Sequence, residues 1–144
     1  MMISTKGRYA LRVMMDLAEH RAEGYISLKE ISQRQGVSMK YLEMIVSLLN
    51  KGTVVKSLRG SSGGYCLARP AAEISVYEIF RLTEGDLAPV ACLSNEPCSN
   101  AEHCRTLPLW ENLDHLIEDY LSGVTVADLV EGNIRKIKKS VDNL

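Results

Sequence analysis

The chain contains 144 residues, a length that favours one domain with an appendage over two full domains. Hydrophobic residues make up 46% of the chain and charged residues 24%, which excludes a disordered or low-complexity protein. Because no apolar run approaches the roughly 20 residues of a membrane-spanning helix and no signal peptide is visible, we expect a cytoplasmic protein without a membrane partner. Four cysteines in such a chain favour metal or redox chemistry over structural disulfides.

The charge of the chain is divided between its two halves. A formal net charge of −1 taken alone argues against a nucleic-acid binder. Residues 1–69, however, carry 11 basic and 5 acidic side chains, a balance of +6, whereas residues 70–144 carry 6 and 13, a balance of −7. Such asymmetry indicates contact with nucleic acid; the alternative is chance clustering on solvated faces.

Three helices are predicted in the first half. Apolar residues recur every three or four positions over residues 5–20, where Asp16 is one of the charges that interrupt the apolar stretch. A capping box of Ser27 and Glu30 opens a short second helix, and Ser38 caps a third after a tight turn. The buried stripe of the third helix is expected to be Leu42, Ile45, Val46 and Leu49.

A β-hairpin is predicted to follow the three helices. Residues 53–58 are rich in β-branched side chains, residues 59–64 form a glycine-rich turn, and residues 65–67 form the returning strand. Three helices and a hairpin are the element order of a winged helix-turn-helix domain, in which the helix after the short turn enters the DNA major groove. The predicted fold class is therefore mainly α with a small β-hairpin.

Candidate DNA contacts lie on the outer face of the third helix and at the hairpin tip. They are Ser38, Lys40, Tyr41, Glu43, Arg59 and Gly60, and Met44 lies on the same outer part of the third helix. Glycine at the tip allows close backbone approach, and Arg59 supplies charge for a phosphate or the minor groove. Glu43 is repelled by DNA unless it accepts a hydrogen bond from a cytosine amino group. Simple solvation is the alternative for the lysines.

The second half combines short helices with one long one. Capping boxes at Ser75–Glu78 and Thr125–Asp128 open two short helices, and a long helix is predicted over residues 109–121. The apolar stripe of the long helix is wide enough to pack against its own domain and a second copy, and the alternative is packing within one subunit. Its dimerisation residues are expected to be Trp110, Leu113, Ile117 and Tyr120. The predicted organisation is a DNA-binding domain over 1–85, a cysteine-bearing loop over 86–108, and a dimerisation helix with a C-terminal segment over 109–144.

Three cysteines in the loop carry the second functional signal. Cys92, Cys98 and Cys104 are spaced Cys-x5-Cys-x5-Cys, wider than the pairs of zinc ribbons and thioredoxin-like motifs. This spacing favours an iron–sulfur cluster held by thiolates, with a fourth ligand from elsewhere; His103 is a candidate. Free thiols or a metal-free thiol switch are the alternatives. Cys66, in a predicted strand, is expected to be a buried inert thiol.

Catalytic constellations are missing from the sequence, which contains no Ser-His-Asp set, phosphate-cradling loop or paired-carboxylate site. We therefore expect no enzymatic activity. A cluster carrier that does not bind DNA is a further alternative, but such a protein needs no basic recognition helix or glycine-rich hairpin.

Motifs along almost the whole chain resemble those of the bacterial winged-helix regulators that include IscR, NsrR and CymR. The similarity rests on the segments STKGRYALR, SLKEISQRQGVSMKYLE, SLRGSSGGYCLA, ISVYEIFRLTEG, LWENL and TVADLV, together with the three loop cysteines. The resemblance implies a homodimer with crossed long helices that binds a partly palindromic double-stranded DNA operator. It also implies that Glu43 tunes which operator class is tolerated.

The cysteine spacing is that of the IscR branch of this family. It implies a repressor that senses iron–sulfur cluster status through a [2Fe-2S] cluster and controls genes of cluster biogenesis. The alternatives within the family are a nitric-oxide- or redox-sensing regulator, with a [4Fe-4S] cluster in NsrR-like members, and the metal-free thiol switch. CymR-like members lack the cysteine cluster, so the three cysteines disfavour that branch.

The fourth ligand departs from both cluster-binding branches. Leu107 stands where the IscR branch has a histidine, and Arg8 stands where NsrR-like members have an aspartate supplied to the partner subunit. The candidates that remain are His103, which ranks first, Glu102, Glu96, Glu43 and a water molecule.

Overall fold

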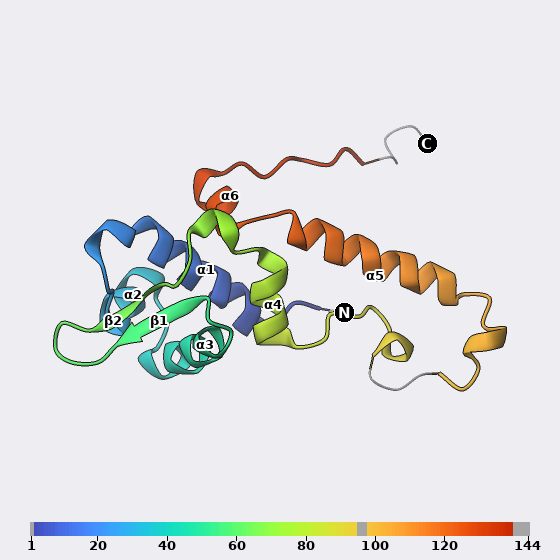
Figure 1. Ribbon diagram of the computed structural model, residues 1–144, viewed down its shortest axis with the longest axis horizontal. Helices are drawn as coiled ribbons and strands as arrows, with labels where there is room; N and C mark the ends of the chain where they lie inside the picture. Colours follow the sequence, from blue (N-terminus) through green and yellow to red (C-terminus); the bar gives the residue numbers. More distant parts are fainter. Residues whose placement is uncertain (1, 95–97, 140–144) are drawn as a thin grey trace.

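The computed structural model describes residues 2–94 and 98–139 of the chain (Figure 1). It is mostly helical with one two-stranded antiparallel hairpin, which confirms the predicted fold class. The α-helices and strands are α1 (Thr5–Glu19), α2 (Leu28–Gln35), α3 (Met39–Lys51), β1 (Val55–Leu58), β2 (Gly64–Leu67), α4 (Val76–Glu84), α5 (Leu107–Ser122) and α6 (Val126–Glu131). Short 3-10 turns are η1 (Arg21–Glu23), η2 (Ala71–Glu73), η3 (Ala91–Leu93) and η4 (Ala101–His103). Among the helices described, none has the length and apolar character needed to cross a membrane.

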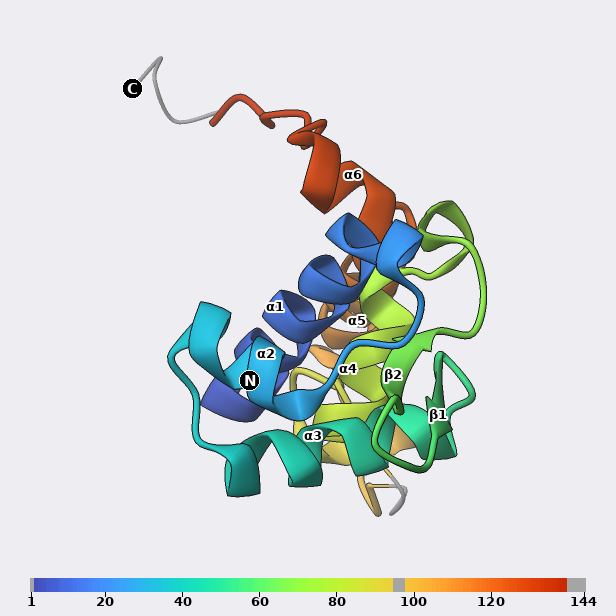
Figure 2. The same cartoon turned by 90° about the vertical axis from the view of Figure 1, so that its left-hand side faces the viewer.

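Helix α1 lies at the centre of the hydrophobic core. Figure 2 shows it crossing the middle of the molecule, with α3 below it and α6 above. The core side chains that it contributes are Ala10, Val13, Met14 and Leu17, and α3 contributes the predicted stripe of Leu42, Ile45, Val46 and Leu49. All eight are at most 1% exposed, so the predicted apolar stripe of α3 is confirmed.

The predicted helix caps are largely confirmed. The backbone N–H of Glu30 donates to Ser27 Oγ (3.2 Å), and the Ser27 N–H donates back to Glu30 Oε2 (3.0 Å). The box at Ser75 is only half formed: Ser75 Oγ accepts the backbone N–H of Glu78 (3.1 Å), whereas the Glu78 carboxylate pairs with Arg69. A tertiary ion pair has therefore taken the carboxylate that a local pattern assigned to the cap.

The hairpin differs from its prediction by one or two residues at its ends. β1 begins at Val55 because Thr53 has a positive φ of 57°, which strand geometry excludes. β2 begins at Gly64, and Tyr65 exchanges two backbone hydrogen bonds of 2.8 Å with Ile26. A Cβ on Gly64 would lie 2.2 Å from the Ile26 carbonyl oxygen, so this close contact between hairpin and helical body requires glycine.

The second half departs further from the predicted boundaries. Helix α5 begins at Leu107, two residues earlier than predicted, because Pro108 lies in the first turn, where proline's missing N–H has no helical partner to lose. The expected loop also contains η3 and η4. Beyond α5 the chain returns to the body: the Val126 N–H donates to the Ile74 carbonyl (2.9 Å) and the Val126 side chain is fully buried.

Candidate functional site

The turn between α2 and α3 sets the direction of α3. Gly36 has left-handed torsion angles (φ 65°, ψ 35°) and caps α2 by donating its N–H to the Ser32 carbonyl (2.9 Å). The Ser32 hydroxyl donates to the Val37 carbonyl (2.5 Å), and the Val37 side chain is buried. Ser38 Oγ then accepts the backbone N–H of Tyr41 (3.2 Å) as the N-cap of α3. These local bonds account for the tight turn of a helix-turn-helix.

The face of α3 opposite its buried stripe is accessible. Ser38, Lys40 and Glu43, three of the predicted DNA contacts, are exposed there. Tyr41, the fourth on this helix, is half-buried, because its ring packs edge-on against the ring of Tyr9 with the centroids 5.9 Å apart. The outer face of α3 is therefore mostly polar, with Met44 also exposed on it and with the ring of Tyr41 fixed by its contact with Tyr9.

The hairpin tip provides the second accessible group of predicted contacts. Arg59 and Gly60 are both exposed, and Gly60 has a φ of 112°. Figure 1 shows this loop projecting at the end of the molecule opposite α5, and Figure 2 shows the hairpin beside α3 along the lower side. The two groups of predicted contacts thus belong to neighbouring elements.

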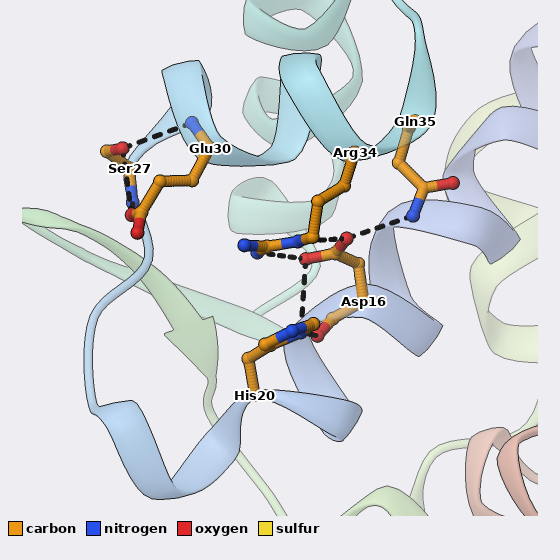
Figure 3. A network of polar contacts seen from close by, with 6 residues as sticks. All are labelled: Asp16, His20, Ser27, Glu30, Arg34 and Gln35. Carbon is orange, nitrogen blue, oxygen red and sulfur yellow. Dashed lines mark hydrogen bonds and ion pairs between the residues drawn. The ribbon is translucent and has the colours of Figure 1, made fainter.

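A buried carboxylate joins α1 to the end of α2 (Figure 3). Asp16 is 1% exposed. Arg34 donates to both of its oxygens, from Nη2 to Oδ1 (2.7 Å) and from Nε to Oδ2 (3.0 Å), and Gln35 Nε2 donates to Oδ2 (2.9 Å). His20 Nδ1 lies 2.8 Å from the Asp16 carbonyl and 3.7 Å from Oδ1. The carboxylate is thereby compensated by groups from two elements.

The hydrogen-bond partners of Asp16 determine whether its buried carboxyl is charged. Burial alone raises the pKa of this carboxyl, but the hydrogen bonds from Arg34 and Gln35, with the positive charge of Arg34, outweigh burial and hold the pKa below its ordinary value. Asp16 therefore stays charged inside the fold, and its charge binds the last turn of α2.

Arg12 makes a parallel connection one turn earlier on α1. Its Nη2 donates to the Gln35 carbonyl (2.7 Å) and its Nε to Gln35 Oε1 (3.0 Å). Its guanidinium also lies over the Tyr9 ring, 4.8 Å from the centroid. Tyr9, Arg12 and Asp16 thus form a row on α1 that contacts the end of α2 and the start of α3.

This row was not predicted from the sequence, in which Asp16 stands out only as an interruption of an apolar stretch. The available signal was position: Asp16 lies three residues after Val13 and next to Leu17, on the face that becomes the core. A charge at such a position calls for a partner, but the sequence does not identify Arg34.

The predicted ligands of the cysteine loop are placed on the surface. Cys92 and Cys104 are half-buried, and Cys98 and His103 are exposed. Within residues 2–94 and 98–139, no three His, Cys, Asp or Glu side chains converge in a way that could hold a metal ion, so the structure does not bring these four residues together. Glu96, another candidate ligand, lies outside the described residues.

Cys104 has a distinctive environment at the start of α5. Its Sγ lies 3.4 Å from Thr106 Oγ1. Hydrogen bonds from the Thr106 side chain and from the backbone N–H groups of Thr106 and Leu107 lower the pKa of the Cys104 thiol. Cys66, by contrast, lies in β2 opposite Lys56 and is half-buried, not fully buried as predicted, because the hairpin has only two strands to cover it.

The apolar stripe of α5 is not covered by the chain itself. No residue of α5 is buried, and the predicted dimerisation residues Leu113 and Tyr120 are 38% and 48% exposed. Trp110 and Ile117 are half-buried, while Leu109 and Leu116 are 58% and 66% exposed. Packing within one subunit, the alternative considered from the sequence, therefore leaves this helix largely accessible.

Comparison with known proteins identifies the family. The Rrf2 family, described as iron-dependent transcriptional regulators, matches residues 3–132. The chain belongs to the Rrf2 family. Its Rrf2 relatives include IscR of Erwinia tasmaniensis, which is 40% identical over 130 residues covering 90% of this chain and 79% of that protein.

Solved structures give the same assignment. CymR, the global cysteine regulator of B. subtilis, matches with a TM-score of 0.75 and 38% identity over 92% of this chain and 98% of that chain. T. potens IscR matches with a TM-score of 0.70 and 37% identity over 96% and 94%. The resemblance inferred from the sequence motifs is confirmed, and this Rrf2 chain is a DNA-binding transcriptional regulator and not an enzyme.

The ion pair at Asp16 predicts a pH dependence of stability for this Rrf2 chain. Because the folded-state pKa lies below the ordinary value of 3.8, the pair contributes stability above that value and loses it as the pH falls through the folded pKa. We expect Asp16→Asn to reduce the free energy of unfolding at pH 7 by about 2–3 kcal/mol, the size of a hydrogen bond to a charged group, and by less at pH 3, where the carboxyl of the unfolded chain is mostly protonated.

Urea unfolding at the two pH values measures this difference. Glu19→Gln, which removes an exposed carboxylate from the same helix, is the matched control and should change stability little at either pH. An Asp16→Asn loss of equal size at both pH values would contradict the account.

Proposed function

We propose that this Rrf2 chain is a homodimeric transcriptional repressor that binds an operator through α3 and the hairpin and senses iron–sulfur cluster status through Cys92, Cys98 and Cys104. Its targets are then genes of iron–sulfur cluster biogenesis. The observation that carries the DNA-binding part is the accessible outer face of α3 beside the exposed hairpin tip.

Charge supports contact of this surface with DNA. Exposed basic side chains are Lys40 and Lys51 on α3, Lys56 on β1 and Arg59 at the hairpin tip. Basic side chains that neutralise phosphates position a protein on the duplex, while groups on the groove-facing side of a helix read the bases. In this arrangement α3 lies in the major groove and Arg59 contacts a phosphate or the adjacent minor groove.

The exposed apolar stripe of α5 supports the proposed pairing of two chains. Four large apolar side chains, Leu109, Leu113, Leu116 and Tyr120, recur every three or four residues and are each at least 38% exposed. An apolar stripe of this period on a 16-residue helix suits packing against the same stripe of a second copy. Trp110 and Ile117 would lie at the edges of that interface.

The donor set fits an iron–sulfur cluster in its chemistry. All three thiols lie outside the hydrophobic core and are free, and thiolates are the usual protein ligands of such clusters. When bound, the cluster supplies the chemistry that responds to iron or oxidants. Hydrogen bonds from Thr106 lower the pKa of Cys104, which favours the thiolate form that ligation requires.

The fourth ligand and the cluster type complete this part of the proposal. His103 precedes Cys104 directly and is exposed, so we favour it as the fourth ligand. A [2Fe-2S] cluster is proposed, with [4Fe-4S] as the alternative. A nitric-oxide or redox sensor, or a metal-free thiol switch among the same cysteines, is the competing function.

The DNA-binding surface is tested by replacing Arg59 with Ala. Removal of this charge should weaken binding to operator and random duplexes in the same proportion. It should also reduce the slope of log affinity against log salt by about 0.9 for each phosphate that the protein no longer neutralises. Fluorescence anisotropy titrations at several KCl concentrations measure both effects.

The matched control is Arg135→Ala, which removes the same charge from the exposed C-terminal segment on the other side of the body from α3. It should leave affinity and slope nearly unchanged. Equal effects of the two variants would refute a specific role for the hairpin tip, and a loss confined to one base pair would assign base reading to Arg59.

The sensor is tested by anaerobic reconstitution with ferrous iron and sulfide. Visible absorption with iron and sulfide analysis should detect a cluster in the wild type and in Cys66→Ser, since Cys66 lies in β2. Cys98→Ser should lose it, and His103→Ala should change its spectrum or stability. No cluster in the wild type, with a disulfide formed among the loop cysteines, would favour the thiol switch instead.

A further inference from the structure

Two methionines of α3 are exposed. Met39 is 43% exposed and Met44 is 42% exposed, although both belong to a helix whose other apolar stripe is completely buried. Large apolar side chains on a surface that otherwise carries lysine, glutamate and serine are informative when they gather at one place. Of the two methionines, Met44 lines a hollow together with the ring of Tyr41.

Met44 borders a hollow on the outer face of α3. The hollow has a volume of about 300 Å³ and is lined by Ser38, Lys40, Tyr41 and Met44. The Tyr41 ring is fixed by its edge-on contact with Tyr9, and Ser38 Oγ is engaged as the helix cap. The walls that remain free for a ligand are therefore a thioether, an aromatic ring and the stem of a lysine.

The major groove presents one base group that suits such walls. Thymine carries a 5-methyl group on its major-groove edge, whereas adenine, guanine and cytosine present hydrogen-bond donors and acceptors there. A flexible, polarisable methionine adapts to an apolar group of this size. Lys40, on the rim of the same hollow, can contact a phosphate or a guanine at the neighbouring position.

We propose that Met44, supported by Tyr41, contacts the 5-methyl group of a thymine in each operator half-site and is thus a specificity-determining residue. The inference rests on the proposed role of α3 as the recognition helix. It predicts a fixed thymine in the half-site at the position that faces the hollow.

The test begins with selection of duplexes from a random library by the full-length wild-type protein, both cluster-free and anaerobically reconstituted. Each thymine of one half-site in the selected operator is then replaced singly by uracil, which removes only the methyl group. Burial of one methyl group corresponds to about a fourfold change in affinity. We expect one uracil position to weaken wild-type binding by about that factor.

Two variants test whether the loss of affinity for the uracil operator depends on the Met44 side chain. Met44→Ala should bind the thymine and uracil operators equally, whereas the matched control Met39→Ala, which removes an equally exposed methionine that does not line the hollow, should retain the fourfold difference. Thermal melts of both variants check that the fold is unchanged. Because the comparison is between two operators for one variant, a general loss of affinity cancels.

The outcomes distinguish a failure of the Met44 contact from a failure of the proposed DNA-binding function. Sequence-specific binding in which every uracil substitution has the same effect on the wild type and on Met44→Ala would overturn the role of Met44 but leave the proposed function intact. Selection of operators without a fixed thymine would also overturn it. If no sequence is enriched over random duplex, the proposed role of α3 fails and the inference fails with it.

Discussion

The buried carboxylate of Asp16 is the interaction on which the helix-turn-helix depends. It lies on the core side of α1 and is bonded by Arg34 and Gln35 from the last turn of α2, immediately before the turn that directs α3. A buried charge without these partners is strongly unfavourable, so the ion pair restricts α2 to one position on α1. The placement of α3, and hence of its outer face, follows from that restriction.

Core packing, the proposed dimerisation and the proposed sensing involve different parts of this short chain. The apolar side of α1 builds the core with α3 and α6, while its polar row bonds the end of α2, directly before the proposed recognition helix. Helix α5 leaves the body with its apolar stripe accessible, and the cysteine segment lies just before it, so a change in that segment acts at the start of the proposed dimerisation helix. The proposed sensing segment and the proposed DNA-contacting hairpin tip therefore lie at opposite ends of the molecule, and the proposed pairing of two chains would connect them.

Helix caps and apolar stripes could be predicted from the sequence because they depend on interactions between residues close together in the chain. The Ser27 and Ser38 caps and the apolar stripe of α3 depend on residues three or four positions apart. The errors arose where distant residues intervene: Arg69 takes the Glu78 carboxylate, and Arg34 makes a buried site of Asp16. For the candidate site, the sequence predicted which side chains are accessible on α3 and at the hairpin tip. It did not predict that no three metal-ligating side chains converge within residues 2–94 and 98–139, since convergence depends on the path of the loop and not on spacing alone.

Hydroxyl-radical footprinting of the selected operator tests the central claim most directly, because that claim joins DNA contact by α3 with pairing through α5. A dimer that presents two recognition helices protects two segments on one face of the duplex, separated by about 10.5 base pairs or a multiple of that distance. A single protected segment, or protection that is no stronger than on random DNA, would contradict the account.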